Sequence, residues 1–195
     1  MAVLRGIPIG RSCGLAAVLW TAAGLAAGAA PLAAQTLTQD EALALAFPDA
    51  ERIERRTAYL TAAQLARARA LAGEGVSVES EIITHYVALR SGRPIGVAYF
   101  DAHRVRTMPE VLMVVVGTDH RIRRIEVLRF QEPPDYRPPQ KWLERFQGRV
   151  LDGDLSLKGT VPNLTGATLT SGAVTGATRR LLALHSVIAP FEASK

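Results

Sequence analysis

Cysteine is almost absent from this chain, since Cys13 is the only one among 195 residues. It precedes an apolar stretch, whereas the acylated cysteine of a lipoprotein would follow such a stretch. We expect Cys13 to be removed together with an N-terminal signal. The mature chain would then have neither a thiol nor a disulfide, which excludes a disulfide-stapled fold and suits an exported protein.

Charge is absent between Arg11 and Asp40, and the centre of this stretch reads CGLAAVLWTAAGLAAGAAPLAA. A basic start, an apolar middle and small residues at the end are typical of a secretory signal. We predict a signal peptide over residues 1–34, with Gln35 as the new N-terminus. A retained membrane anchor is the alternative, because about 20 apolar residues suffice to span a bilayer.

A concentrated basic run is also missing, although the isoelectric point is near 9.9 and the net charge is +5. Loss of Arg5 and Arg11 with the signal would leave 5 − 2 = +3 over 195 − 34 = 161 residues. The remaining arginines are scattered among acidic residues, as in DAERIERR, and no aromatic residues alternate with them. This pattern indicates a solvated surface, so we expect no nucleic-acid partner.

Motifs for metal binding and hydrolysis are absent as well. The spacing of the four histidines, His85, His103, His120 and His185, is not that of a metal site, and no GxGxxG or GxxxxGK loop occurs. The DGD sequence at 152–154 is more typical of a turn than of a cation site. We therefore predict no metal ligands and no catalytic residues.

Two helices are predicted near the start of the mature chain. Thr38 and Glu41 have the spacing of a capping box, and so do Thr61 and Gln64, whose helix would end at Gly73. We predict a helical N-terminal region over residues 35–78, ahead of all the strands.

Period-two patterns and short turns then predict four consecutive strands, at residues 81–90, 95–102, 111–119 and 121–130. A short helix opened by proline is expected over 138–148, and a last helix over 179–188. Leu181, Leu184 and Ile188 would share one face of that last helix. The fold class is α+β, an antiparallel sheet covered by helices, in a single domain after the N-terminal signal segment.

The segment LTGATLTSGAVTGATRRLL, residues 164–182, fits neither a typical helix nor a typical strand. Its small residues allow close approach to the backbone, and it supplies several hydroxyls before a helix that we expect to start after Thr170. A helix start of this kind attracts a phosphate group. The alternative is an ordinary Thr or Ser cap on an alanine-rich helix.

The sequence TGATLTS within this segment resembles the Ser/Thr-Gly-Ala-Thr signature of the FMN-binding domain. That domain occurs in sodium-pumping NADH:quinone oxidoreductase, in the Rnf complex and in small exported flavoproteins. GRPIGVAYFDA, VLMVVVGTDHRIRRIEVL, FQE (ending at Glu132) and WLERFQGR are similar to family segments in the same order. The resemblance implies an FMN-binding domain over residues 79–190.

The resemblance also implies a cofactor site. FMN would be bound by Thr165, Gly166, Ala167, Thr168, Leu169, Thr170 and Ser171, and a flavin transferase using FAD would attach it to Thr168 through a phosphoester. The second Thr-Gly-Ala-Thr, residues 175–178, is expected on the surface of the last helix. One departure is Pro162, since the family signature has an aspartate three residues before the first Thr or Ser.

The function implied is that of an exported electron-transfer flavoprotein, periplasmic or on the outer face of the cytoplasmic membrane. Its partners would be the flavin transferase and a membrane or periplasmic redox protein, and it would be an electron carrier more than a stand-alone enzyme. Two alternatives stay open: a flavin-dependent reductase of a small substrate, and a degenerate domain that serves as an interaction module without flavin.

Overall fold

The computed structural model describes residues 37–192. The predicted signal peptide, Cys13 and the expected cleavage site lie outside the described residues. Within residues 37–192, no helix combines the length and the apolar character that crossing a membrane requires.

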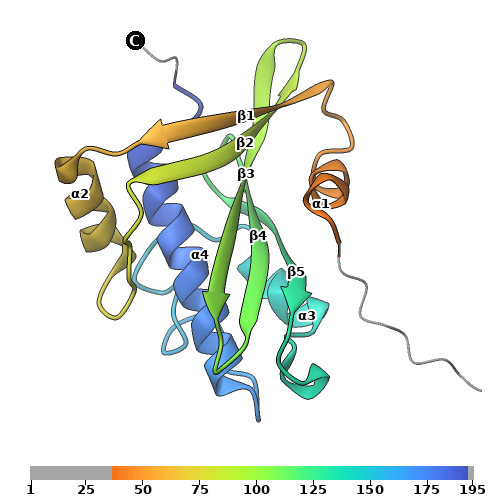
Figure 1. The fold of residues 1–195 in the computed structure, drawn as a ribbon, viewed down its shortest axis with the longest axis vertical. Coiled ribbons are helices and arrows are strands. Elements are labelled where there is room, and N and C mark those ends of the chain that lie inside the picture. Colours follow the sequence, from red (N-terminus) through yellow and green to blue (C-terminus); the bar gives the residue numbers. More distant parts are fainter. Residues whose placement is uncertain (1–36, 193–195) are drawn as a thin grey trace, which may run out of the picture. The chain divides into compact units, whose positions relative to one another are not determined.

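A five-stranded antiparallel sheet forms the centre of the fold (Figure 1). Its strands lie side by side in sequence order, so each pairs with the strand next to it in the chain. The strands are β1 (Arg52–Tyr59), β2 (Ile82–Arg90), β3 (Arg93–Arg104), β4 (Pro109–Gly117) and β5 (Ile122–Phe130). The predicted α+β class and the antiparallel sheet are therefore confirmed.

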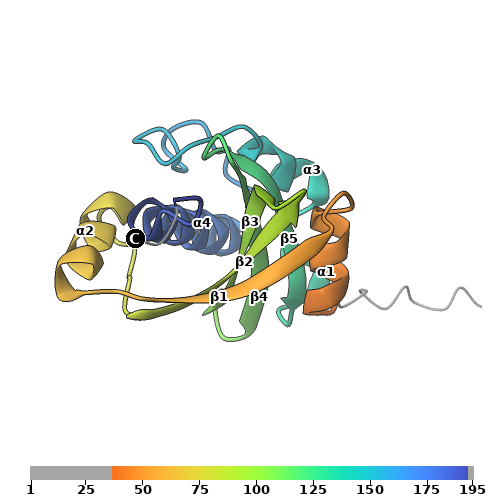
Figure 2. The ribbon, with the colours of Figure 1, turned by 90° about the horizontal axis from the view of Figure 1, so that it is seen from above.

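Helices cover both faces of this sheet (Figure 2). On one face, α1 packs Leu43 and Phe47 against inward-facing residues of β2, β3 and β4. On the other face, α2 and α4 contribute to a larger core that includes Tyr99, Leu112 and other strand residues. The helices are α1 (Gln39–Ala46), α2 (Ala62–Ala72), α3 (Gln140–Leu143) and α4 (Thr168–Ile188), with 3₁₀ turns η1 (Pro134–Tyr136) and η2 (Glu144–Phe146).

Both predicted capping boxes are present. The Thr38 N–H donates to Glu41 Oε2 at 2.8 Å, and the Glu41 N–H donates to Thr38 Oγ1 at 3.3 Å. The same reciprocal pair joins Thr61 and Gln64, at 3.0 and 3.2 Å. Each box satisfies N–H groups that an isolated helix end leaves without a partner, so both helices start where the sequence predicts.

Strand β1 is the element that the sequence analysis missed. It lies between α1 and α2 in the chain. The sheet therefore has five strands where four were predicted, and the region predicted to be helical over residues 35–78 contains a strand. All eight residues of β1 pair with β2, from Arg52 opposite Leu89 to Tyr59 opposite Ile82. Because β1 is an edge strand whose residues are all exposed or only partly buried, arginine and glutamate occupy it and no apolar alternation marks it.

Helix α4 differs from its expected form in two ways. It begins at Thr168, before the expected start after Thr170 and well before the predicted range of 179–188, although it ends at Ile188 as predicted. The second Thr-Gly-Ala-Thr lies on its buried face instead of its surface. Thr175 and Thr178 are almost fully buried, and their hydroxyls donate to the carbonyls of Ser171 and Val174 at 2.7 and 2.8 Å. A hydroxyl bonded four residues back needs no water, so threonine is tolerated in this interface.

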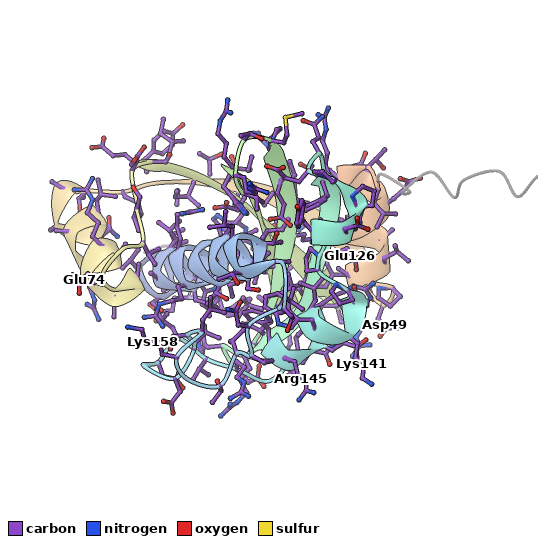
Figure 3. The ribbon with its side chains drawn as sticks, turned by 90° about the horizontal axis from the view of Figure 1, so that it is seen from below. Asp49, Glu74, Glu126, Lys141, Arg145 and Lys158 are labelled. Carbon is purple, nitrogen blue, oxygen red and sulfur yellow. The ribbon has the colours of Figure 1, made fainter. Side chains whose placement is uncertain are left out.

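Charged side chains of both signs lie at the periphery and point away from the core (Figure 3). Asp49, Glu74, Lys141, Arg145 and Lys158 are examples, drawn from different parts of the chain. The buried charges described below are therefore exceptions that need a structural reason.

Candidate functional site

The first Thr-Gly-Ala-Thr forms a tight turn that leads into α4. The Ala167 N–H donates to the Leu164 carbonyl at 3.0 Å, and Gly166 has a φ of +80° at the third position of the turn. A turn of this form favours glycine there, because other residues are strained at positive φ. A Cβ added to Gly166 would meet no atom within 4 Å, so this side of the turn is open.

Ser171 holds the turn from the inside. Its hydroxyl accepts from the Leu164 N–H at 3.0 Å and donates to the Ala167 carbonyl at 3.1 Å. Its side chain is fully buried, and Thr170 is nearly so. Among the seven predicted site residues, Ser171 therefore holds the turn and Thr170 is buried beside it in the chain, whereas the exposed ones are Thr165, Gly166, Thr168 and Leu169.

The first turn of α4 lacks the side-chain cap that α1 and α2 possess. Its N-cap residue is Ala167, and no side chain of the described residues caps it. The first intrahelical bond runs from the Ser171 N–H to the Ala167 carbonyl at 3.0 Å. The N–H groups of Thr168, Leu169 and Thr170 precede that bond and carry the positive end of the helix dipole, a site that favours an anion.

A pocket of about 190 Å³ lies over this helix start. Gly166, Ala167, Thr168, Leu169 and Thr170 line one side of it. Arg106 from the β3–β4 hairpin and Tyr136 from η1 line the other, and the Arg106 guanidinium carbon is 5.5 Å from the centre of the Tyr136 ring. Five of the seven predicted site residues thus meet in one pocket.

Arg106 and Tyr136 are site residues that sequence reasoning missed. Each stands well before the signature, in a turn-rich segment. Nothing in their local sequence marks them, because only the folding of the hairpin and of η1 brings them to the pocket.

The tip of the β3–β4 hairpin is fixed by Glu132. Its Oε1 accepts from the N–H groups of Arg106, Thr107 and Met108, at 3.2, 2.7 and 2.9 Å. The bonds from Thr107 and Met108 hold the pKa of the Glu132 carboxyl below its usual value. The glutamate identified in the FQE segment therefore fixes the backbone at Arg106.

The chain enters the signature turn between two hydrogen bonds. The Trp142 Nε1–H of α3 donates to the Pro162 carbonyl at 2.6 Å. The Asn163 side-chain amide then donates to the Thr168 hydroxyl oxygen at 3.2 Å. The residue beside the position of the family aspartate thus contacts the predicted attachment site directly.

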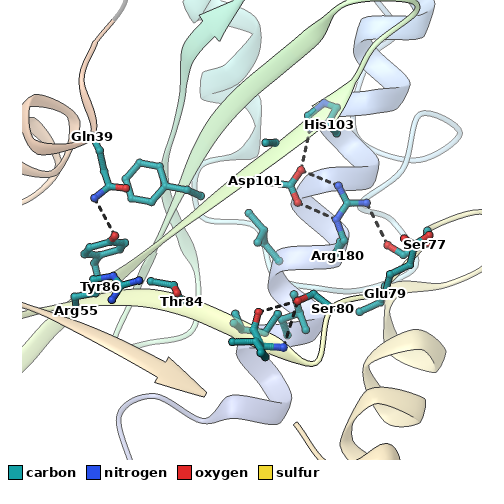
Figure 4. Close-up of a pocket in the computed structure, with 17 residues that line it drawn as sticks. Gln39, Arg55, Ser77, Glu79, Ser80, Thr84, Tyr86, Asp101, His103 and Arg180 are labelled. Carbon is teal, nitrogen blue, oxygen red and sulfur yellow. Dashed lines mark hydrogen bonds and ion pairs between the residues drawn. The ribbon is translucent and has the colours of Figure 1, made fainter. Parts of the chain in front are cut away.

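A second cavity, of about 630 Å³, lies between β2, β3, α4 and the loop after α2 (Figure 4). Its walls combine apolar side chains, among them Ile83, Phe100 and Leu184, with a polar edge. Arg180 of α4 forms part of that edge and pairs through two nitrogens with Asp101 of β3, both at 2.8 Å.

His103 continues this ion-pair cluster from the cavity into the protein. Its ring nitrogens lie 2.9 Å from Asp101 Oδ1 and 3.0 Å from Glu110 Oε2. Burial acts against a charge on His103, but the hydrogen bonds to these two carboxylates raise its pKa to about 9. Burial would raise the pKa of Asp101, yet the bonds from His103 and Arg180 hold it below its usual value. His103 is therefore protonated at neutral pH, and the ion pair of Asp101 with Arg180 ties β3 to α4.

His120 and His185 form a hydrogen-bonded chain with Tyr99, in which Tyr99 and His185 are buried and His120 is exposed. His185 Nδ1 lies 2.9 Å from the Tyr99 hydroxyl, and His185 Nε2 lies 2.9 Å from His120 Nδ1. Burial, with smaller effects of His120 and His85, lowers the pKa of His185 to about 4, so its ring is neutral.

Over residues 37–192, no group of three or more acidic, histidine or cysteine side chains could hold a metal ion. Asp152 accepts from the N–H groups of Asp154 and Leu155, which is the predicted turn.

Residues 108–183 match the model of the FMN-binding domain, which confirms the resemblance read from the signature. The crystal structure of Shewanella oneidensis NqrC is similar at a TM-score of 0.49 and 14% identity, over 78% of this chain and 90% of that chain. A search of curated proteins finds no match to this chain.

Proposed function

Because residues 108–183 match an FMN-binding domain, we propose that the chain carries FMN at the start of α4 and transfers electrons through it. The observation that carries the proposal is the pocket over the uncapped helix start, which the signature itself lines. The flavin would supply the redox chemistry, and the protein would position it and tune its potential.

The turn and the helix start fit the phosphate of FMN. Gly166 leaves open space, and the N–H groups of Thr168, Leu169 and Thr170 offer donors without a side-chain cap. A helix N-terminus stabilises an anion by about 0.3–1 kcal/mol at an exposed site. This contribution orients a phosphate but is too small to retain a cofactor alone.

The rest of the pocket fits an aromatic ring system. Tyr136 offers an aromatic face, and Leu169 is 57% exposed although it is a large apolar residue. Arg106 would place a positive charge beside the flavin, where it favours the more negative reduced form.

Thr168 is the residue to which we assign a covalent bond. In the transfer, Thr168 Oγ1 would form a bond to the FMN phosphorus of FAD, the pyrophosphate bond would break, and AMP would leave with the hydroxyl proton. Thr168 is exposed at the pocket, so a flavin transferase could reach it. A covalent link makes retention independent of affinity, which suits a protein outside the cytoplasm.

Export and the redox partners are part of the same proposal. The uncharged stretch between Arg11 and Asp40 supports a signal that directs the protein to the periplasm or the outer face of the cytoplasmic membrane. There it would exchange electrons with a membrane or periplasmic partner. N-terminal sequencing of protein from its own host should find Gln35 first, and an intact Met1 in a cytoplasmic fraction would overturn the export proposal.

The cofactor proposal is tested by the visible spectrum of protein purified from its own host, which should be that of a flavin. Coexpression with a flavin transferase should then add the mass of one FMN minus water, and the increase should survive denaturation. Pro162→Asp keeps the backbone carbonyl that Trp142 binds and should raise the labelled fraction, because it restores the family aspartate. A colourless protein from the host and from coexpression would favour the flavin-free module.

One observation supports the second candidate, a flavin-dependent reductase. The cavity of about 630 Å³ has the size of a small-molecule site. Helix α4 contributes to both cavities, and Arg180 in the larger one follows Thr170 in the smaller one by ten helical residues, or about 15 Å along the helix. Turnover of small soluble acceptors by the flavin-loaded protein would support the reductase, and its absence the electron carrier.

A further inference from the structure

Asn163 is the only asparagine in the chain, and it stands next to Pro162, where the family aspartate would be. Its Nδ2 donates to Thr168 Oγ1 at 3.2 Å. Both neighbours are held by other bonds, since the Pro162 carbonyl accepts from Trp142 and the Leu164 N–H donates to Ser171. The backbone on either side of Asn163 is thus fixed, and its amide is directed at the attachment hydroxyl.

An amide and a carboxylate act differently beside a phosphate. A carboxylate can take a proton but repels an anion, whereas the Asn163 amide cannot serve as a base and offers N–H donors. Hydrogen bonds from a neutral donor to a charged acceptor are stronger than those between neutral groups. An amide at this position is therefore suited to hold a phosphate and unsuited to deprotonate Thr168.

We infer that Asn163 is a phosphate-binding residue, which holds the FMN phosphate non-covalently together with the N–H groups at the start of α4. The inference rests on the proposed function, because it assigns a residue to the same cofactor. It goes further in one respect: the chain would select FMN over riboflavin before any covalent bond forms. Asn163 would also position the phosphate at Thr168, within reach of the hydroxyl.

The test uses the full chain expressed without a flavin transferase and freed of flavin. Dissociation constants for FMN and riboflavin are measured by quenching of flavin fluorescence. Asn163→Asp, which changes the amide into a carboxylate of the same shape, should weaken FMN binding about tenfold or more and leave riboflavin binding unchanged. Exposed Gln147→Glu makes the same chemical change away from Thr168 and serves as the control.

The pH dependence separates charge from a structural effect. The deficit of Asn163→Asp should shrink as the pH falls toward about 3.9, where an ordinary aspartate becomes neutral and again donates. Equal FMN affinity in the wild type and Asn163→Asp would overturn the inference while leaving the flavin site standing. Equal losses for FMN and riboflavin would also overturn it, because the phosphate would not be the group recognised. Failure of the wild type to bind either flavin would instead count against the proposed function.

Discussion

The two copies of Thr-Gly-Ala-Thr have the same sequence and opposite surroundings. In the first copy, residues 165–168, Gly166 has a positive φ and Thr168 is exposed at a pocket. In the second copy, residues 175–178, all four residues are helical, and both threonine hydroxyls are bonded to backbone carbonyls. Identical side chains thus form the proposed attachment site in one place and helix packing in the other.

The difference shows that position in the fold decides what a motif can do. A hydroxyl can react only where it is exposed and where donors beside it have no intrahelical partner, and α4 meets both conditions only at its first turn. Ten residues later both threonine hydroxyls are buried and bonded to carbonyls of the preceding turn, and the backbone N–H groups lie within the helix.

Removal of one hydroxyl from each copy should have the largest effect, because only the first copy is expected to bind FMN covalently. Thr168→Ala should abolish the mass increase of one FMN minus water on coexpression with a flavin transferase. Thr178→Ala should keep it, while losing about 1 kcal/mol of unfolding free energy because a buried methyl group and a satisfied hydroxyl are removed. Intact-mass spectrometry and thermal unfolding give both readouts. Loss of flavin in Thr178→Ala but not in Thr168→Ala would show that the wrong copy was chosen.

Bulk at the two glycines should have the next largest effect. Gly166→Val should abolish flavin binding for two reasons. A φ of +80° is unfavourable for a β-branched residue, and the added atoms would fill the open side of the turn where the phosphate is proposed to bind. Gly176→Val is the matched control within the helix and should retain the flavin. Flavin absorbance per protein measures both variants, and full retention in Gly166→Val would contradict this account of the turn.

The free energy of unfolding should depend on pH through the ion-pair cluster that follows the second copy on α4. Arg180 follows that copy by two residues and joins the Asp101–His103–Glu110 cluster. The folded pKa of His103, about 9, exceeds an unfolded value of about 6.5, so its contribution is complete below pH 6.5 and is lost as the pH rises through 9.

Wild-type stability should therefore fall between pH 6.5 and 9, by an amount on the order of 1–3 kcal/mol. His103→Gln should show a flatter profile over the same range, since it lacks the titrating ring. Chemical denaturation at a series of pH values checks this. A wild-type curve no steeper than that of the variant would show that His103 does not carry the effect.

The smallest expected effect is an increase in stability. Gly176→Ala should raise the free energy of unfolding by about 0.5–1 kcal/mol, because alanine loses less backbone freedom in a helix and a Cβ there meets no atom within 4 Å. Thermal unfolding measures the gain, and the flavin content should not change. A loss of stability would contradict the open space beside Gly176 on α4.

Much of the fold was predictable because its signals are local. The capping boxes at Thr38 and Thr61 and the four apolar strands follow from neighbouring residues. Helix α3 begins directly after Pro139, as expected, but it ends at Leu143 and a 3₁₀ turn replaces the rest of the predicted helix. Strand β1 was not predictable, since its pairing with β2 and not its own side chains makes it a strand. The burial of Thr175 and Thr178 was missed for a similar reason, because sequence spacing alone did not show which face of α4 meets the core.

The site divides in the same way. The signature residues 165–171 could be named from the sequence, and five of them line the pocket. Arg106 and Tyr136 could not, because they reach the pocket through a hairpin and a 3₁₀ turn. The ion-pair cluster includes Asp101, Glu110 and Arg180. Arg180 follows Asp101 by 79 residues, so no local sequence pattern predicts the cluster.

The three hydrogen bonds that Glu132 accepts also affect where an anion could bind. Three successive N–H groups at the hairpin tip converge on one point and would form a binding nest for a phosphate. The protein fills that nest with its own carboxylate, so the tip acts as a site already occupied by an internal ligand. An added anion would therefore find no free donors at the hairpin tip, whereas the N–H groups at the start of α4 lack a side-chain cap and could bind it.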